Sequence, residues 1–410
     1  MNGLRPLVPI LTTAGIVLGG NGLQSTLIAL RGAHEGFSPA VIGFMGTAYY
    51  AGFLLGCLAI VRIMRSVGHI RAFAALAAIA ASVTLVLVMA IDAATWTACR
   101  LVAGFCFAGL FTVMESWLNS GVSNDNRARV LSLYRVIDIG AVTGAQFLIP
   151  VFGVEGFAIF AVMAIMITLS LVPVSLGDRS NPRPPEDVKL DLRRAWAISP
   201  IAALGCIAIG VTNSAFRTLS PVYAQDIGLG TADVATFVSV SIIGGALIQY
   251  PLGHASDRHD RRSVLLVTTA LALVAAVALS LFSGSGRLVN FSLVFVFGAF
   301  AMPLYSLSAA HANDRAATNE YVMLNAALML FYSVGAIVGP FAAAAAMQRF
   351  GPQALFQFSA AVYVLFIGLI LWRMRVRAPA SPDQRGRFTA LLRTSTIFAR
   401  LADWRGDRKR

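Results

Sequence analysis

The chain contains 410 residues, of which 57% are hydrophobic and 12% are charged, and its formal net charge is +13. Because a soluble domain usually carries about 25% charged residues, this composition excludes an ordinary soluble protein and indicates an integral membrane protein. Apolar runs long enough to cross a bilayer, about 20 residues each, follow one another along nearly the whole chain.

The apolar runs predict twelve membrane-spanning helices in two sets of six, that is, an all-α integral membrane protein. The first run is longer than the apolar stretch of about 7–15 residues in a signal peptide, so it is counted as a span. The predicted spans are 7–30, 40–63, 70–91, 95–119, 130–152, 157–176, 198–224, 232–252, 264–282, 288–311, 321–348 and 354–373. The predicted domains are an N-terminal six-helix bundle at 1–176, a cytoplasmic linker at 177–197, a C-terminal six-helix bundle at 198–374 and a basic cytoplasmic tail at 375–410.

Arginine and lysine residues gather in alternate loops, and this predicts the orientation of the chain. With both termini in the cytoplasm, the outside loops hold little more than Arg31, Arg287 and Arg349. The positive net charge is therefore attributed to topology in a bacterial-type inner membrane, and not to nucleic-acid binding. The basic tail is expected either to lie on anionic lipid as an amphipathic helix or to remain solvated.

Two sequence patterns recur at a nearly constant spacing. The stretch "FAGLFTVMESWLN" from residue 107 can be laid on "FAMPLYSLSAAHAN" from residue 300, an offset of 193 residues. "GAVTG" from residue 140 can be laid on "GAIVG" from residue 335, an offset of 195 residues. Since internal repeats are common in transporters, the offsets predict two homologous, pseudo-symmetric six-helix halves.

The loop after the eighth predicted span carries a recognisable motif. Its sequence "GHASDRHDRR", residues 253–262, matches the G-x-x-x-D-R-x-G-R-R signature of the major facilitator superfamily, except that Asp260 replaces the last glycine. The equivalent loop of the first half keeps Gly68, His69 and Arg71 but lacks the aspartate. "RLVAG", residues 100–104, resembles the Arg-x-x-x-Gly motif of proton-coupled drug antiporters. "GAVTGAQFLIP" resembles their glycine-rich fifth-span motif without its Gly-Pro pair, which "GAIVGP" supplies in the eleventh span.

The resemblance to this superfamily implies a secondary transporter whose two bundles rock about a site near the middle of the membrane, as a monomer and without a cofactor. The arginine motif of the fourth span favours proton-coupled efflux of a small organic solute. Proton-coupled uptake of a polar or anionic metabolite is the alternative. A non-transporting membrane receptor or scaffold that has kept the fold is an alternative of another class.

The two signature loops contain candidates for a cytoplasmic gate. Gly253 suits a close approach of helices, and Asp257 can bind Arg258 or a helix terminus and so latch the two bundles. Alternatively, the arginines of these loops only anchor the topology. The candidate gate residues are Gly68, Arg71, Gly253, Asp257, Arg258, Arg261 and Arg262.

Ionisable residues inside the predicted spans are functional candidates, because charge within a bilayer is costly. Glu115 and Arg135 lie at similar depth on consecutive antiparallel helices, about 13 and 16 Å from the intervening turn, and Asp138 shares the helix face of Arg135. The candidate proton-coupling residues are Glu115, Arg135, Asp138 and Arg100. The alternatives are a permanent ion pair that holds the fourth span against the fifth, and an anchoring role for Arg100.

By analogy with the superfamily, the first, fourth, seventh and tenth spans line the central cavity. Arg217, with Asn213 one turn before it, can bind an anionic or strongly polar group, or alternatively extend to the membrane surface or pair with Asp226. His311 is alternatively an interfacial residue. The candidate substrate-binding residues are Asn21, Gln24, Asn213, Arg217, Tyr305 and His311. The expected partners are a small-molecule substrate, protons and membrane lipid.

Motifs for direct energy conversion or catalysis do not occur in the sequence. There is no G-x-x-x-x-G-K-[ST] nucleotide loop, no C-x-x-C-H haem motif and no H-E-x-x-H. The chain is therefore not expected to be an enzyme, and movement against a gradient must draw on an ion gradient. Four cysteines lack metal-ligand spacing and are expected to pack as small apolar residues, so no metal or cofactor is predicted.

Overall fold

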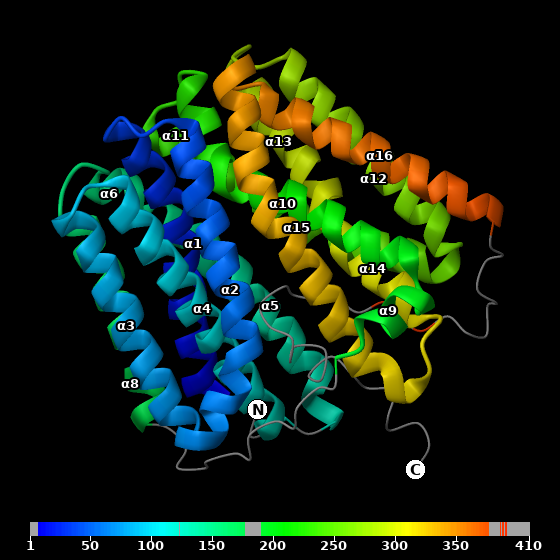
Figure 1. Cartoon of the computed structure of the whole chain (residues 1–410), viewed down its shortest axis with the longest axis horizontal. Coiled ribbons are helices and arrows are strands. Elements are labelled where there is room, and N and C mark those ends of the chain that lie inside the picture. Colours follow the sequence, from blue (N-terminus) through cyan, green and yellow to red (C-terminus); the bar gives the residue numbers. More distant parts are fainter. Residues whose placement is uncertain are drawn as a thin grey trace. The chain divides into compact units, whose positions relative to one another are not determined.

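A computed structural model of the chain describes residues 7–122, 124–176 and 190–376, together with Gly386, Phe388, Ala390 and Leu391. These residues form helices and no strand, as Figure 1 shows. Eleven of the described segments are helical, long and apolar enough to cross a membrane, and α1 (Val8–His34) completes the predicted set of twelve. The protein is therefore an all-α membrane protein, as predicted. Most of the predicted linker and tail lies outside the described residues.

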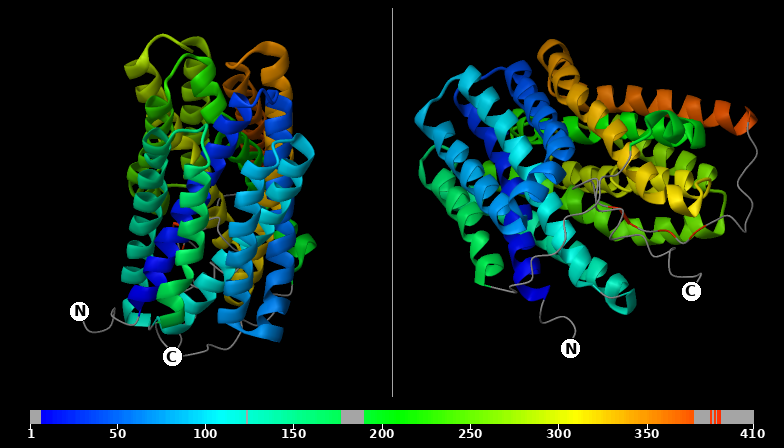
Figure 2. Two further views of the ribbon diagram at one scale, coloured as in Figure 1. Left: turned by 90° about the vertical axis from the view of Figure 1, so that its left-hand side faces the viewer. Right: turned by 60° about the horizontal axis from the view of Figure 1, so that its bottom comes forward.

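The first of two compact units contains the helices of the N-terminal half. It covers Met1–Phe37 and Ala48–Val188, whereas Ser38–Thr47, which include the first residues of α2, group with the second unit. Its helices are α1, α2 (Pro39–Val67), α3 (His69–Met89), α4 (Ala93–Gly121), α5 (Asn124–Gln146), α6 (Leu148–Phe152), α7 (Ala158–Leu169) and α8 (Leu171–Leu176). The main helix pairs are α1 with α5 and α3 with α4, and Figure 2 shows these helices running side by side.

The second unit contains the helices of the C-terminal half. They are α9 (Leu192–Ile198), α10 (Pro200–Asp226), α11 (Thr231–Arg258), α12 (Arg261–Leu281), α13 (Arg287–Ala301), α14 (Leu304–Asn313), η2 (Thr318–Glu320), α15 (Tyr321–Phe350) and α16 (Ala354–Val376). The predicted span 288–311 is thus two helices, because the α-helix is interrupted at Met302 and Pro303. A proline has no backbone N–H and clashes with the preceding turn, so it can interrupt a regular helix. The main helix pairs are α10 with α15 and α11 with α13.

Each unit contains a helix crossing at which the two backbones touch, and in the second unit α10 and α15 approach as closely at Gly335. In the first unit, a Cβ atom on Gly52 of α2 would overlap the Leu101 carbonyl of α4, and one on Gly104 would overlap the Tyr49 carbonyl. In the second unit, Gly244 and Gly298 make the corresponding approaches between α11 and α13. The paired glycines are 192 and 194 residues apart, close to the offsets of the sequence repeat. The duplication therefore extends from the sequence to the packing inside each unit.

Candidate substrate-binding and coupling sites

A buried arginine cluster lies in the first unit, where α1, α2, α3 and α4 meet. Arg100 of α4 is only 5% exposed. Its Nη1 donates to Gln24 Oε1 at 2.7 Å, and its guanidinium carbon lies 4.3 Å from the centroid of the Tyr49 ring. The Tyr49 hydroxyl donates to Asn21 Oδ1 at 2.6 Å, and Gln24 Nε2 donates to Thr84 Oγ1 at 3.2 Å. We call these five residues the Arg100 cluster.

The sequence positions of the cluster follow from helix geometry. Asn21 and Gln24 are three residues apart on α1, so they share one face, and that face meets Arg100 and Tyr49. The cluster thus joins Arg100, predicted to take part in coupling, with two residues predicted to bind substrate. Sequence analysis missed Tyr49 and Thr84. The pair of tyrosines in "TAYYAG" was the available signal, since a tyrosine hydroxyl inside an apolar span needs a partner.

The Arg100 cluster is chemically suited to hold an anionic or strongly polar group. A guanidinium stays charged and offers a planar fork of donors. An amide oxygen and an aromatic face fix its orientation, and cation–aromatic contact stabilises it in a site removed from water. Charge at this depth is expensive and is retained where it has a function.

Glu115 lies toward the other end of α4. It is 15 residues after Arg100, about 22 Å along the helix axis, and its side chain is completely buried. The Tyr134 hydroxyl of α5 donates to Glu115 Oε1 at 3.3 Å. The next residue, Ser116, hydrogen-bonds His69 Nε2 of α3 at 3.0 Å. Sequence analysis did not identify Tyr134, and it noted His69 only as a loop residue.

An ion pair lies on α5 beside this carboxylate. Arg135 Nη1 is 2.8 Å from Asp138 Oδ2, and the two side chains are 21% and 16% exposed. The three-residue spacing places both on one helix face. Together with Glu115, the pair provides two carboxylates and a permanently charged arginine within one unit. The carboxylates can exchange protons when water reaches them.

In the second unit, a polar and aromatic surface surrounds Tyr305. This residue is 3% exposed, and its ring packs edge-on against Tyr332 of α15 with centroids 5.6 Å apart. The neighbouring Ser306 Oγ accepts a hydrogen bond from Gln249 Nε2 of α11 at 3.1 Å. Only Tyr305 was predicted among these residues. The other three lie in apolar runs that give no distinguishing signal.

Asn213 and Arg217 lie on α10 of the same unit. Their four-residue spacing places them on one face, and Arg217 is exposed. Asn213 Nδ2 is buried and donates to no hydrogen-bond acceptor among the described residues. A buried donor without an acceptor is costly, so an oxygen atom of a solute would stabilise it.

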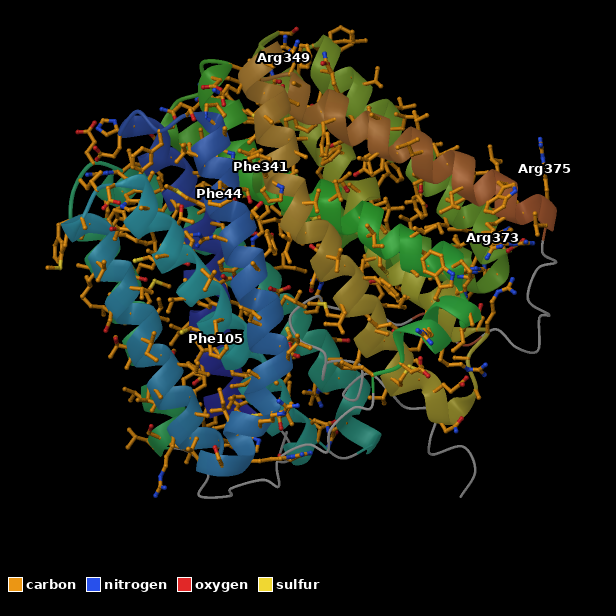
Figure 3. The ribbon with its side chains drawn as sticks, in the orientation of Figure 1. Phe44, Phe105, Phe341, Arg349, Arg373 and Arg375 are labelled. Carbon is orange, nitrogen blue, oxygen red and sulfur yellow. The ribbon has the colours of Figure 1, made fainter. Side chains whose placement is uncertain are left out.

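His311 lies apart from Tyr305, in a basic pocket. It is 4% exposed. Arg373, at the end of α16 in Figure 3, is one of the pocket's basic residues. The lining residues are Ser199, Pro200, Ile201, Arg262, His311, Arg315 and Arg373. Among the candidate substrate-binding residues, His311 thus shares a pocket with a candidate gate residue, Arg262.

The second signature loop forms an ion-pair network with the end of α14, which we call the gate network. Arg261 Nη2 is 3.1 Å from Asp257 Oδ1, and Arg261 Nε is 2.6 Å from Asp314 Oδ2. The side chains of Arg261 and Asp314 are 3% and 2% exposed. Asp314, at the end of α14, was not predicted. The signature motif covers only one of the two segments that form the network.

The aspartate that departs from the signature has a local role. Asp260 caps α12, since its Oδ1 accepts from the backbone N of Arg262 at 3.0 Å, and it pairs with the Arg262 side chain at 2.8 Å. Burial raises the pKa of Asp260, but the hydrogen bonds from Arg262 outweigh this and hold the pKa below its usual value. In the first-half loop, Gly68 has a φ of 84° and precedes α3, a conformation that favours glycine. Arg71 and Arg258 are exposed.

Sequence comparisons agree with this architecture. The profile of the family described as "Major Facilitator Superfamily" matches residues 10–322 and 237–405. An uncharacterized MFS-type transporter of Yersinia pestis is 25% identical over 352 residues, which cover 85% of this chain and 90% of that protein. An uncharacterized MFS-type transporter of Enterobacter is 25% identical over 374 residues, covering 90% and 95% of the two chains.

Solved structures share the fold at low sequence identity. The crystal structure of the nucleoside transporter NupG has a TM-score of 0.74 and 13% identity, and the match covers 92% of this chain and 100% of that one. A bacterial homologue of the human lysosomal transporter Spinster, in an inward-facing and occupied conformation, has a TM-score of 0.74 and 14% identity, with coverage of 93% and 98%.

Proposed function

The chain belongs to the major facilitator superfamily and is a secondary transporter that works by alternating access. We propose that it exports a small organic solute in exchange for protons. The observation that carries the proposal is the Arg100 cluster, a buried guanidinium oriented by an amide and an aromatic ring. Its chemistry favours a solute with an anionic or strongly polar group.

The proposed coupling residues are Glu115, Arg135 and Asp138. Arg100 and Glu115 are separated by about 22 Å on one continuous helix, which places the polar-group site and the buried carboxylate at different depths of the membrane. A rocking motion that exposes the two ends of α4 to opposite sides in turn would allow protonation on one side and solute release on the other. The proposed location is the inner membrane, with both termini cytoplasmic and the protein monomeric.

The second candidate function is proton-coupled uptake of a polar or anionic metabolite. The observation in its favour is the buried Asn213 amide together with Arg217 on the same face of α10, which adds polar recognition in the second unit. A receptor or scaffold role is disfavoured because buried charges cost stability that apolar residues would recover.

The proposal predicts a solute-dependent proton flux in liposomes that contain the purified protein and an internal pH dye. Solutes added outside are organic acids, sugars, amino acids and lipophilic cations. Antiport drives protons out and raises the internal pH, whereas symport carries protons in and lowers it. Replacing Arg100 with lysine should raise the half-saturating solute concentration about tenfold, because an ammonium lacks the planar fork.

Arg349 provides the matched control for this experiment. It is exposed at the end of α15, as Figure 3 shows, so Arg349→Lys should leave the half-saturating concentration unchanged. Equal behaviour of Arg100→Lys and wild type would remove Arg100 from the solute site. The absence of a pH change for the whole panel, with folded protein, would contradict proton coupling.

A further inference from the structure

Four described residues lie beyond α16, and they contact the second unit. Gly386, Phe388 and Leu391 form backbone hydrogen bonds to it, and Leu391 is 6% exposed. Ala390 is half-buried. We call residues 386–391 the tail segment.

The first part of the tail segment binds the gate network. The backbone N of Gly386 donates to Asp314 Oδ1 at 3.1 Å, and the backbone N of Phe388 donates to Asp257 Oδ1 at 2.8 Å. Arg261 in turn donates to the Gly386 carbonyl. Two backbone amides of the tail segment thus reach the same network. Buried carboxylate oxygens need donors, and the tail segment supplies them.

The second part of the tail segment binds beside the predicted solute site. The backbone N of Leu391 donates to Ser306 Oγ at 3.1 Å, and Ser306 Oγ donates to the Leu391 carbonyl at 3.2 Å. Ser306 is 2% exposed and adjacent in sequence to Tyr305. Leu391 therefore covers the Ser306 hydroxyl, which also accepts the hydrogen bond from Gln249.

The surface that receives the tail segment is formed by one face of α11 and one face of α14. On each helix, three residues at positions i, i+4 and i+8 share a face. The first of the three is polar, the second is small and the third is an aspartate. These residues are Gln249, Gly253 and Asp257 on α11, and Ser306, Ala310 and Asp314 ending α14. The rise from Ser306 to Asp314 is about 12 Å. Five steps of extended chain reach about 17 Å, so the tail segment is long enough to follow both helices.

The small residue in the middle of α11 makes room for an aromatic side chain. Gly253 faces the Phe388 ring so closely that a Cβ atom at this position would overlap it. Phe388 is the flexible partner in this contact, so a larger residue at position 253 would displace the tail segment. Gly253, the glycine of the signature motif, thus packs against Phe388 of the same unit.

We propose that this surface is a binding site for an extended polypeptide and that the tail segment occupies it as a tethered inhibitor. The inhibition rests on the proposed function, because a docked tail covers Ser306, next to Tyr305 in sequence, and binds the two aspartates of the gate network. Transport then requires the tail segment to leave. An increased rate after tail removal is the functional signature.

Docking is tested by hydrogen–deuterium exchange of the full-length protein, read by mass spectrometry on peptides that contain residues 386–391. Their amides should exchange about tenfold faster in Gly253→Leu than in wild type. This factor is expected if the substitution removes a docking free energy of about one hydrogen bond. Gly368, on α16, faces open space, so Gly368→Leu is the matched control and should exchange like wild type. Equal, fast exchange in all three proteins would overturn docking.

Inhibition is tested by comparing initial solute-driven pH changes of the full chain and of a chain that ends at residue 385. The shortened chain should be several-fold faster, and a synthetic peptide of residues 386–391 should slow it again. The same peptide with Phe388→Ala should be weaker. Equal rates despite amide protection would overturn the inhibitory role. Protection without flux in either chain would overturn the proposed function alone, because the exchange measurement needs no solute.

Discussion

Glu320 shows how a single carboxylate fixes a short helix in place. Its Oε1 is 2.7 Å from Arg194 Nε of α9, and its Oε2 accepts from the backbone N of Ala317 at 3.1 Å. The Arg194 hydrogen bond is the main cause, and the Ala317 bond the second, of a Glu320 pKa below the usual value. The side chain thus holds α9 against the start of α15 in its ionised form.

This pair predicts a pH-dependent stability. Because the folded state lowers the pKa of Glu320, the unfolded state binds more protons between the two pKa values, and stability rises with pH in that range. Wild type should be slightly more stable than Glu320→Gln at neutral pH. The difference should be lost as the pH falls below 4.5, the usual glutamate pKa, and through the lowered pKa of Glu320. Thermal unfolding in detergent checks this.

The control is Glu155→Gln, since the side chain of Glu155 is 76% exposed. It should unfold like wild type across the same pH range. A stability difference between wild type and Glu320→Gln that stays constant down to pH 3 would contradict the assigned ionisation.

At the scale of single residues, the sequence identified the types of functional side chain better than their neighbours. Arg100 was predicted from the resemblance of "RLVAG" to an antiporter motif, and Asn21 and Gln24 because the first span lines the cavity by analogy with the superfamily. Their meeting could not be predicted, because Arg100 and Gln24 are 76 residues apart and touch only through helix packing. Tyr49 was missed although the tyrosine pair of "TAYYAG" marked it, and Gln249 was missed because it lies in a span outside the set expected to line the cavity.

At the scale of helices, the glycine crossings fix the spacing of two helix pairs, α2 with α4 and α11 with α13. At Gly298 a Cβ atom would overlap the carbonyl of Ser241, so neither helix can yield without moving its backbone. The closest approach of α11 and α13 is therefore set by glycine.

The crossing predicts a large difference between two glycine substitutions. Gly298→Ala should destabilise the second unit by about 1–3 kcal/mol, the cost of overpacking. Gly368→Ala, which meets open space, should be neutral or slightly stabilising, since alanine favours helix. Thermal unfolding in one detergent checks both. Equal unfolding temperatures would contradict the close crossing.

The spans themselves were predictable from hydropathy, because a segment must be apolar over about 20 residues to cross a bilayer. Their interruptions were less so. Pro303 breaks the predicted span 288–311 into α13 and α14, although a proline inside a membrane helix does not always do so: Pro251 and Pro340 lie within α11 and α15. The outcome depends on neighbouring groups that satisfy the freed carbonyls.

At the scale of the whole molecule, coupling requires that a proton site and the solute site cannot change independently. Replacing Asp138 with asparagine keeps the size of the side chain but removes its ability to bind and release a proton. We expect gradient-driven solute flux to fall below about a tenth, a cost of 1.4 kcal/mol or more, while solute counterflow persists. Flux and counterflow in the same liposomes measure this.

Asp92→Asn is the control, because Asp92 caps α4 through Thr95 N at 2.8 Å and asparagine caps equally well. It should keep both activities. Equal loss of flux and counterflow in Asp138→Asn would assign Asp138 to structure and not to coupling.

The duplication was visible in the sequence as two offsets, and it accounts for most of the predicted architecture. The contact of the tail segment was not predictable. It is made mainly by backbone amides, which every residue except proline carries, so its sequence leaves little trace. Only Gly253, read as a signature residue, marked the position where Phe388 packs.

The glycine crossings also supply internal rulers. At these crossings two helix backbones meet with no side chain between them, so sliding or tilting one helix against the other would make main-chain atoms overlap. We therefore expect α2 to move together with α4, and α11 together with α13. A pair of spectroscopic labels on the two helices near such a crossing should therefore give the same distance in every conformation. That distance can serve as the reference for label pairs whose distance changes during transport.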